Sequence, residues 1–342
     1  MMRSLQPAQK DFDQMMQMLT GYFVTQVAGA LATYSIADHL AKGPATADEI
    51  ATWAGVDPQA AFRLLRACTS LGLATYDGNK FIATPLLGTL QRDVPGSLHG
   101  LAIAFTSPGF WQPWGRFTDA IRTNTPQTFS TLGTSIWEYY KEHPEEGAAF
   151  TRAMHGLTSP IVEDVVGVID TSKVELAADI GGASGTLVHR LMAANPNLHG
   201  IVVDLPEVVS SATTAARELG LSNRSTASPS NFFEYVPAAD LYLLKHILHD
   251  WSDNETLAIL KRCRESIRPG GRLVVIERLL GEMGEPPLGP LMDLHMMVNF
   301  TGRERTLDEY RALIEKAGFH FSKVTRIRPP LAVIEATANE HE

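Results

Sequence analysis

Residues 176–185, LAADIGGASG, are the stretch from which the fold can be deduced. Residues 176–180 form an apolar run typical of a buried strand, and the glycines at 181, 182 and 185 indicate a turn. Residues 186–194 continue as a helix. A strand, a glycine turn and a helix in this order place backbone N–H groups at the carboxyl edge of a parallel sheet, where open α/β folds bind small ligands.

The residues of this turn favour one class of ligand. The dinucleotide fingerprint G-x-G-x-x-G needs a glycine where this chain has Ala183, which disfavours NAD and FAD, and no phosphate-binding P-loop sequence is present. A second apolar strand at 200–203 ends at Asp204, an acid well placed to accept hydrogen bonds from a ribose diol. A glycine turn with a ribose acid suggests a mononucleoside cofactor such as S-adenosylmethionine.

Strands and helices alternate from residue 176 to residue 277, which is typical of a doubly wound sheet. Residues 220–234 are expected to be irregular, and Asp253 is expected to cap the helix that follows it. A hairpin at 319–327 and 331–336 would add two antiparallel strands at the sheet edge. The other elements expected here are strands at 240–244 and 272–277 and helices at 207–219, 254–268 and 307–317, the last with a Thr306–Glu309 capping box.

Residues 44–90 have the order of a winged helix-turn-helix. A helix at 47–54, a helix at 58–71 and strands at 74–76 and 80–83 follow one another, the strands joined by an Asp-Gly-Asn turn. Winged helices often bind DNA, but the second helix carries only Arg63 and Arg66 as basic residues and the wing adds only Lys80. The formal net charge of −9 also argues against nucleic acid and anionic membranes. A structural or dimerising role is therefore favoured.

Residues 11–41 look helical and are apolar on several sides. One helix face cannot bury so many apolar side chains within a small domain, so a partner chain is favoured, and a core helix with its neighbours is the alternative. The residues concerned are Met15, Met16, Leu19, Tyr22, Phe23, Val27, Leu31, Tyr34, Ile36 and Leu40.

The rest of the composition is that of an ordinary globular protein. Only Cys68 and Cys263 are present, each in an apolar helical pattern, so buried reduced thiols are expected rather than a disulfide framework or a zinc site. The first 14 residues lack a signal sequence, and no apolar run is long enough to span a bilayer. A soluble cytoplasmic protein is expected.

His249 follows the strand at 240–244, on the same sheet edge as Gly181 and Asp204. Histidine is the side chain best suited to take a proton near neutral pH, although a structural histidine is equally compatible with this position. His246 and His249 also have the spacing of a metal-binding pair. No acidic or cysteine ligand stands at a matching distance, so no metal is expected.

The order DIGGASG, VVDLPEV, NFFEYVPAADLYLLKHILHDWSD, RPGGRLVVIE and GRERT resembles the S-adenosylmethionine-dependent O-methyltransferases of the plant caffeic-acid and bacterial natural-product type. The resemblance covers nearly the whole chain. It implies a mostly parallel seven-stranded sheet at 166–342, a winged-helix dimerisation domain at 1–98 and a helical linker with substrate-pocket residues at 99–165. It also implies a homodimer and a small hydroxylated aromatic acceptor.

The resemblance assigns roles to individual residues. Lys245 matches the cofactor-binding lysine, and His249 matches the catalytic base, with Glu277 and Glu304 as the carboxylates that flank it. The remaining matches are Gly181, Asp204, Asn231 and Phe232 for the cofactor and Phe150, Met154 and Asn299 for the substrate.

The chain departs from the family pattern at three places. Ala183 replaces a third glycine, Asn231 replaces an aspartate, and residues 281–300 differ from the plant enzymes in length and character.

The expected reaction is methyl transfer from S-adenosylmethionine to a phenolic hydroxyl. His249 would remove the proton, and either Glu277 or Glu304 would orient the imidazole. An N- or C-methyltransferase, or a hydroxylase or decarboxylase that retains the cofactor, is a second reading. A DNA-binding regulator that senses a metabolite is a third, disfavoured by the lack of a basic recognition helix.

Overall fold

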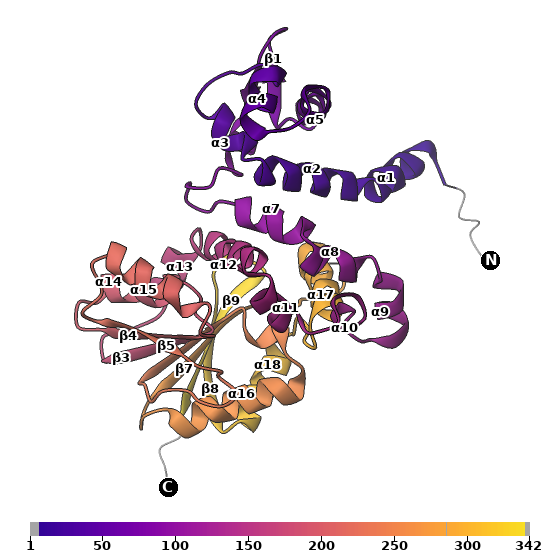
Figure 1. Ribbon diagram of the computed structural model, residues 1–342. Helices are drawn as coiled ribbons and strands as arrows, with labels where there is room; N and C mark the ends of the chain where they lie inside the picture. Colours follow the sequence, from indigo (N-terminus) through magenta and orange to yellow (C-terminus); the bar gives the residue numbers. More distant parts are fainter. Residues whose placement is uncertain (1–6, 285, 339–342) are drawn as a thin grey trace, which may run out of the picture. The chain divides into compact units, whose positions relative to one another are not determined.

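The computed structural model in Figure 1 describes residues 7–284 and 286–338 of the chain. It comprises two compact units, Met1–Pro108 and Gly109–Glu342, here the N-terminal and C-terminal units. The three-part division at 98 and 165 stays a prediction. Of the segments discussed above, residues 1–6 and 339–342 lie outside the described residues, as does position 285.

The N-terminal unit contains the predicted helix, helix and hairpin. The Thr46 side chain caps α4 (Ala47–Ala54) with Glu49 in a capping box, and Asp57 caps α5 (Pro58–Ser70). The two strands of the wing, β1 (Ala74–Tyr76) and β2 (Phe81–Ala83), are antiparallel. The other helices are α1 (Gln9–Leu19), α2 (Gly21–Thr33), α3 (Ile36–Leu40), α6 (Pro85–Gly88) and α7 (His99–Thr106).

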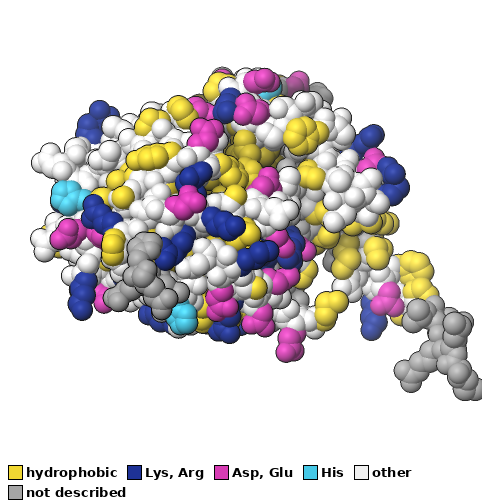
Figure 2. Space-filling model, turned by 90° about the horizontal axis from the view of Figure 1, so that it is seen from below, with side chains coloured by type: hydrophobic (Ala, Val, Ile, Leu, Met, Phe, Trp, Pro, Cys, Tyr) yellow, Lys and Arg dark blue, Asp and Glu magenta, His cyan; other side chains and the backbone are white. Residues whose placement is uncertain are grey.

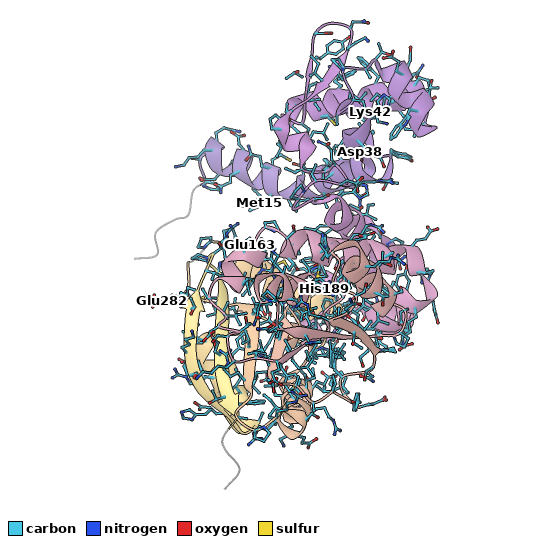
Figure 3. The ribbon with its side chains drawn as sticks, turned by 90° about the vertical axis from the view of Figure 1, so that its left-hand side faces the viewer. Met15, Asp38, Lys42, Glu163, His189 and Glu282 are labelled. Atoms are coloured by element: carbon cyan, nitrogen blue, oxygen red, sulfur yellow. The ribbon has the colours of Figure 1, made fainter. Side chains whose placement is uncertain are left out.

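The apolar residues at 11–41 divide into two groups. Leu31, Ile36 and Leu40 are buried in the core of the N-terminal unit, as the second reading expects. The whole of α1 has no buried residue, and Met15, labelled in Figure 3, is more than half exposed. The exposed apolar face of α1 and the first turn of α2 consists of Phe12, Met15, Met16, Met18, Leu19, Tyr22, Phe23 and Val24.

The C-terminal unit is built on the predicted seven-stranded sheet, in the order β5-β4-β3-β6-β7-β9-β8. The first five strands of this order are parallel, and β9 pairs antiparallel with both β7 and β8. The predicted edge hairpin is therefore confirmed. The strands are β3 (Leu176–Ile180), β4 (His199–Asp204), β5 (Ser225–Pro229), β6 (Leu241–Lys245), β7 (Arg272–Arg278), β8 (Phe319–Arg326) and β9 (Leu331–Ala338).

Two sequence expectations in this unit are wrong. The stretch expected to be irregular contains β5, a polar edge strand that lacks the apolar alternation by which strands are recognised. The cap of α16 (Asp253–Ser266) is Ser252. Its hydroxyl accepts from the Glu255 N–H, and the Glu255 carboxylate accepts from the Ser252 N–H. Asp253 instead pairs with Arg305.

Helices cover both faces of the sheet, and one hydrophobic core lies on each face. Alternate residues of the central strands supply the two cores, so Leu244 and Val275 enter one and Leu243 and Ile276 the other. The remaining helices are α8 (Pro108–Trp114), α9 (Phe117–Thr123), α10 (Thr128–Leu132), α11 (Ile136–Glu142), α12 (Pro144–Thr158), α13 (Val162–Val166), α14 (Thr186–Ala194), α15 (Val209–Glu218), α17 (Leu288–Asn299) and α18 (Leu307–Lys316).

The surface is mixed in charge. On the face seen in Figure 2, Lys and Arg side chains lie among Asp and Glu side chains. Among the described residues, no helix is both long enough and apolar enough to cross a membrane.

Candidate active site

The glycine turn after β3 lies against the end of β6. Gly181 has a φ of +68°, and a Cβ built there would lie 2.4 Å from Ile247 Cδ1 and 3.8 Å from Phe232 Cε1. A side chain at this position would overlap Ile247, so the close packing of the turn here requires glycine. The glycine turn therefore forms a cradle with the Phe232 ring beside it, and this arrangement suits the flat base of a nucleoside.

Asp204, at the end of β4, is bonded to the same turn. Its carboxylate accepts the Ala183 N–H at 2.8 Å and the Leu205 N–H at 2.7 Å. Burial raises the pKa of Asp204 to about 6. Ala183 itself has a φ of +50°, the left-handed conformation that favours glycine, at the position where the family pattern has one. Ala183 therefore adopts the left-handed conformation that a glycine takes easily.

The other two predicted cofactor residues lie at different depths. Lys245 ends β6, and burial, followed by the positive charge of Arg278, lowers its pKa to about 8. Asn231 is exposed, and its side chain makes local bonds to the Phe233 N–H and the Glu234 carboxylate. Its carboxamide is thus already engaged on both sides.

His249 is brought together with both predicted carboxylates. It lies in the short 3₁₀ helix η1 (Leu248–Asp250) that follows β6, and only 5% of it is exposed. Its Nδ1 is 3.0 Å from Glu304 Oε1 and 3.7 Å from Glu277 Oε2. Asp250, which the sequence analysis missed although it adjoins His249, has its Oδ1 3.5 Å from the other ring nitrogen, Nε2.

The two glutamates have different roles. Glu304 is the hydrogen-bond partner of the His249 ring. Glu277, near the end of β7, uses Oε1 to accept backbone N–H groups of Ile247 and Leu248 at 3.1 and 3.0 Å. Glu277 therefore holds the backbone that carries His249, and Glu304 fixes the imidazole.

The charges around His249 favour its protonated form. Burial alone would lower the pKa of His249, but the negative charges of Glu277, Asp250 and Glu304 outweigh burial and raise it to about 9. Burial raises the pKa of Asp250 to about 7 and also raises that of Glu277. The imidazole is therefore a strong base in a nearly closed site.

Two further residues of the GRERT segment fix the His249 loop. Arg305 is fully buried and donates to the Leu248 and Trp251 carbonyl oxygens at 2.9 and 2.8 Å. Gly302 lies so close to the loop that a Cβ there would be 2.0 Å from the His249 carbonyl oxygen. The sequence alone assigned roles to Glu304 and Thr306 of this segment, and its glycine and second arginine were the available signal for the other two residues.

Phe150 belongs to an aromatic cluster, and Asn299 directly precedes another of its members in the chain. The cluster consists of Phe110, Trp137, Tyr140, Phe150 and Phe300. Phe150 is 5.3 Å from Tyr140 and 5.9 Å from Trp137 between ring centres, and Trp137 stacks on Trp251 of the His249 loop at 6.1 Å. Met154 is half-buried one turn beyond Phe150 on α12. The cluster therefore extends to the candidate base.

Asn299 is buried beside His295. Its amide nitrogen donates to the His295 carbonyl oxygen at 3.0 Å, whereas its Oδ1 is buried without a hydrogen-bond partner among the described residues. His295 Nδ1 accepts from Trp114 Nε1 at 3.0 Å. An acceptor molecule with a second donor group would satisfy the Asn299 oxygen.

His249, Glu277 and Glu304 each offer one ligand atom, and these atoms lie within 4.8 Å of one another. The arrangement is one that can hold a cation, so the expected absence of a metal stays a prediction. His246, the other histidine of the suspected metal pair, has its Nδ1 3.1 Å from Lys245 Nζ.

Comparison with known proteins finds two domains of one enzyme family in this chain. Residues 114–320 match the O-methyltransferase domain, and residues 16–86 match the O-methyltransferase dimerisation domain. The phenazine O-methyltransferase PhzM of Lysobacter antibioticus is 33% identical over 94% of this chain and 95% of that protein. The 3-amino-4-hydroxybenzoate 4-O-methyltransferase of Streptomyces cremeus is 34% identical over 94% of this chain and 89% of that protein.

Solved structures agree in fold. The crystal structure of LaPhzM has a TM-score of 0.92 and 32% identity, covering 95% of this chain and 98% of that one. The O-methyltransferase NcsB1, solved with S-adenosylmethionine and 2-hydroxy-5-methyl naphthoic acid, has a TM-score of 0.80 and 32% identity, covering 92% and 96%.

The chain therefore belongs to the S-adenosylmethionine-dependent O-methyltransferases. Within them it is of the bacterial natural-product type, with the family's dimerisation domain in its N-terminal unit.

Proposed function

We propose that this protein methylates a phenolic hydroxyl of a small aromatic natural product, with His249 as general base. The observation that carries the proposal is the buried His249–Glu304 hydrogen bond at the carboxyl edge of the sheet. Bound S-adenosylmethionine supplies an electrophilic methyl group on a sulfonium. A phenol with a pKa near 10 is mostly protonated at neutral pH, so its attack gains from a base that removes the proton.

The hydrogen bond to Glu304 determines which ring atom can act. With Nδ1–H donated to Glu304, the neutral imidazole has its lone pair on Nε2, and this atom takes the phenolic proton. Glu304, Glu277 and Asp250 then stabilise the imidazolium. After transfer of the methyl group the proton leaves to solvent, and the raised pKa of His249 makes this release depend on pH.

The neighbouring residues provide binding and orientation. We assign Gly181, Asp204, Phe232 and Lys245 to the cofactor because they line one edge of the sheet around the cradle. Asn231 is kept as an adenine-contacting residue that would have to leave its local bonds. Phe150, Met154 and Asn299 are assigned to an aromatic acceptor, because flat ligands pack well on aromatic side chains. The relatives named for hydroxybenzoate and naphthoic acid support an aromatic acceptor.

The exposed apolar face of α1 supports a homodimer formed through the N-terminal unit. Eight large apolar side chains are exposed on α1 and the first turn of α2, and most of them lie within the residues that match a dimerisation domain. No role for nucleic acid, membranes or a metal is part of the proposal.

The experiment is a methylation assay of the purified protein with S-adenosylmethionine and a panel of phenols and matched anilines, read by mass. The expected product carries one added methyl on the phenolic oxygen. His249→Gln should lower turnover by roughly 10²- to 10⁴-fold and leave the affinity for S-adenosylhomocysteine unchanged. His320→Gln, on the exposed side of β8, is the matched control and should behave as wild type.

Two results would contradict the proposal. Full turnover in His249→Gln would refute the assignment of His249 as the base. Methylation of anilines alone would show that the acceptor atom is nitrogen and not oxygen.

A further inference from the structure

Arg278 is a cation at the ligand edge of the sheet with no role in the mechanism above. It ends β7 and lies next to Glu277 in sequence, but successive side chains of a strand point to opposite faces. Lys245 ends the neighbouring strand β6, where its register partner on β7 is Ile276, two residues before Arg278. Lys245 and Arg278 therefore lie on the same face of adjacent strands.

Neither cation has a hydrogen-bonded carboxylate within the described part of the chain. The Arg278 side chain is 15% exposed, and its nearest acid atom is Glu304 Oε1, 3.8 Å from Nη1, which is beyond hydrogen-bond reach. Among residues 7–284 and 286–338, the one hydrogen-bond partner of Lys245 Nζ is His246 Nδ1, at 3.1 Å. Buried Arg305, by contrast, donates to two carbonyl oxygens and to the Asp253 carboxylate. The Arg278 nitrogens are not enclosed by the described residues, so the guanidinium is open to an arriving anion as well as to water.

His246, which follows Lys245 in the chain, adds a neutral donor at this end of β6. Because Lys245 donates to Nδ1, the ring proton lies on Nε2, which is buried without a partner in the part of the chain described. Burial, and then the charges of Lys245 and Arg278, keep the pKa of His246 well below its usual value, so the ring stays neutral. Its φ of +54° is rare for a non-glycine residue, and its ring stacks on that of His249, with 5.4 Å between the ring centres and 24° between the planes.

We propose that Arg278 and His246 bind a carboxylate, and that the acceptor carries it beside the hydroxyl to be methylated. This inference rests on the proposed function. A guanidinium matches a carboxylate in shape and charge and can bind it through two parallel N–H···O bonds. The substrate class is then a hydroxylated aromatic acid.

The position of Arg278 favours the acceptor as the source of the carboxylate. Arg278 lies on β7 beside Glu304, and its charge acts on His295 of α17, after the larger effects of burial and of His249, to lower the pKa of that residue. The glycine turn and Asp204 belong to β3 and β4, on the other side of β6. The amino-acid part of the cofactor also carries a carboxylate, so the test separates the two sources.

The test measures binding without turnover, by isothermal titration of the full-length protein. Salicylate and salicylamide differ in the carboxylate, and S-adenosylhomocysteine and methylthioadenosine differ in the amino-acid part. Wild type should bind salicylate more tightly than salicylamide by about tenfold or more. Arg278→Gln should abolish that preference, while the ratio of its affinities for the two nucleosides stays at the wild-type value. Arg278→Lys, which keeps the charge but not the fork, should retain part of the preference.

Arg262→Gln is the control, because the Arg262 side chain is 41% exposed and its Nη1 donates to Glu265 on the outer side of α16. In Arg278→Gln, the affinity for S-adenosylhomocysteine relative to methylthioadenosine could fall tenfold while the preference for salicylate over salicylamide is unchanged. That result would overturn the acceptor assignment in favour of the cofactor carboxylate. Unchanged ratios for both pairs would overturn the anion site. A wild type that shows the salicylate preference but methylates no phenol would contradict the proposed function alone.

Discussion

Replacing Glu304 by glutamine should move the pH dependence of catalysis to lower pH. With the pKa of His249 at about 9, roughly one molecule in a hundred has the neutral imidazole at about pH 7, and about half have it at about pH 9. The rate constant kcat/KM should therefore rise roughly fiftyfold between these pH values. The rate constant rises with pH because His249 acts as a base only when it is deprotonated.

The change removes one negative charge and keeps the shape of the side chain. Glu304 Oε1 lies 3.0 Å from His249 Nδ1, and one charge at such a distance is worth more than about 1.4 kcal/mol in a buried site, or at least about one pKa unit. The rising limb of Glu304→Gln should therefore lie at least about one pH unit below that of wild type. The glutamine oxygen still accepts from Nδ1, so the tautomer is kept. The maximal rate should fall, because the imidazolium loses a carboxylate.

The assay is the initial rate of methyl transfer over this pH range, with two phenols of different acidity. Ionisation of the phenol also gives a rising limb, but that limb follows the phenol and is indifferent to residue 304. A limb that stays in place in Glu304→Gln, or that moves only with the phenol, would refute the assignment of the base. Glu309→Gln, a surface capping residue of α18, serves as the control.

Three further changes test other parts of the site. Asp204→Ala should weaken S-adenosylhomocysteine binding by about tenfold or more, because the carboxylate also holds the Ala183 N–H of the turn; unchanged affinity by calorimetry would contradict this. Gly302→Ala should cost about 1–3 kcal/mol in unfolding free energy and lower kcat, since its Cβ would overlap the His249 carbonyl; normal melting and turnover would show that the loop adapts freely. Met15→Glu should shift the protein towards a monomer in sedimentation, and a retained dimer would place the interface elsewhere.

Local patterns predicted the elements that bind and orient ligands. The strand at 176–180 and the helix at 186–194 lie within the predicted bounds because apolar runs and glycines are strong local signals. The strand β5 was missed because it lies at the sheet edge, where polar residues are tolerated and the pattern is weak. The cap of α16 was misplaced by one residue because Ser252 and Asp253 are both good capping residues.

Contacts between distant segments could not be predicted in this way. The family resemblance placed both glutamates near His249 but left open which one orients the ring, and only the folded chain separates them. Asp250 and Arg278 stand beside predicted residues, yet nothing in the sequence indicates that one faces Nε2 and that the other has no hydrogen-bonded acid. Such relations depend on which strand neighbours which, and therefore on the complete sheet.

The insertion of β9 between β7 and β8 has a consequence for synthesis of the protein. Strand β7 carries Glu277, and its second neighbour, β9, consists of residues Leu331–Ala338, which are made only after α17, α18 and β8. On the ribosome the parallel strands β3 to β7 can assemble first, and β7 then exposes an open, apolar edge until β9 emerges. A nascent chain that stalls before residues 331–338 have emerged would therefore expose the β7 edge, which is prone to aggregation.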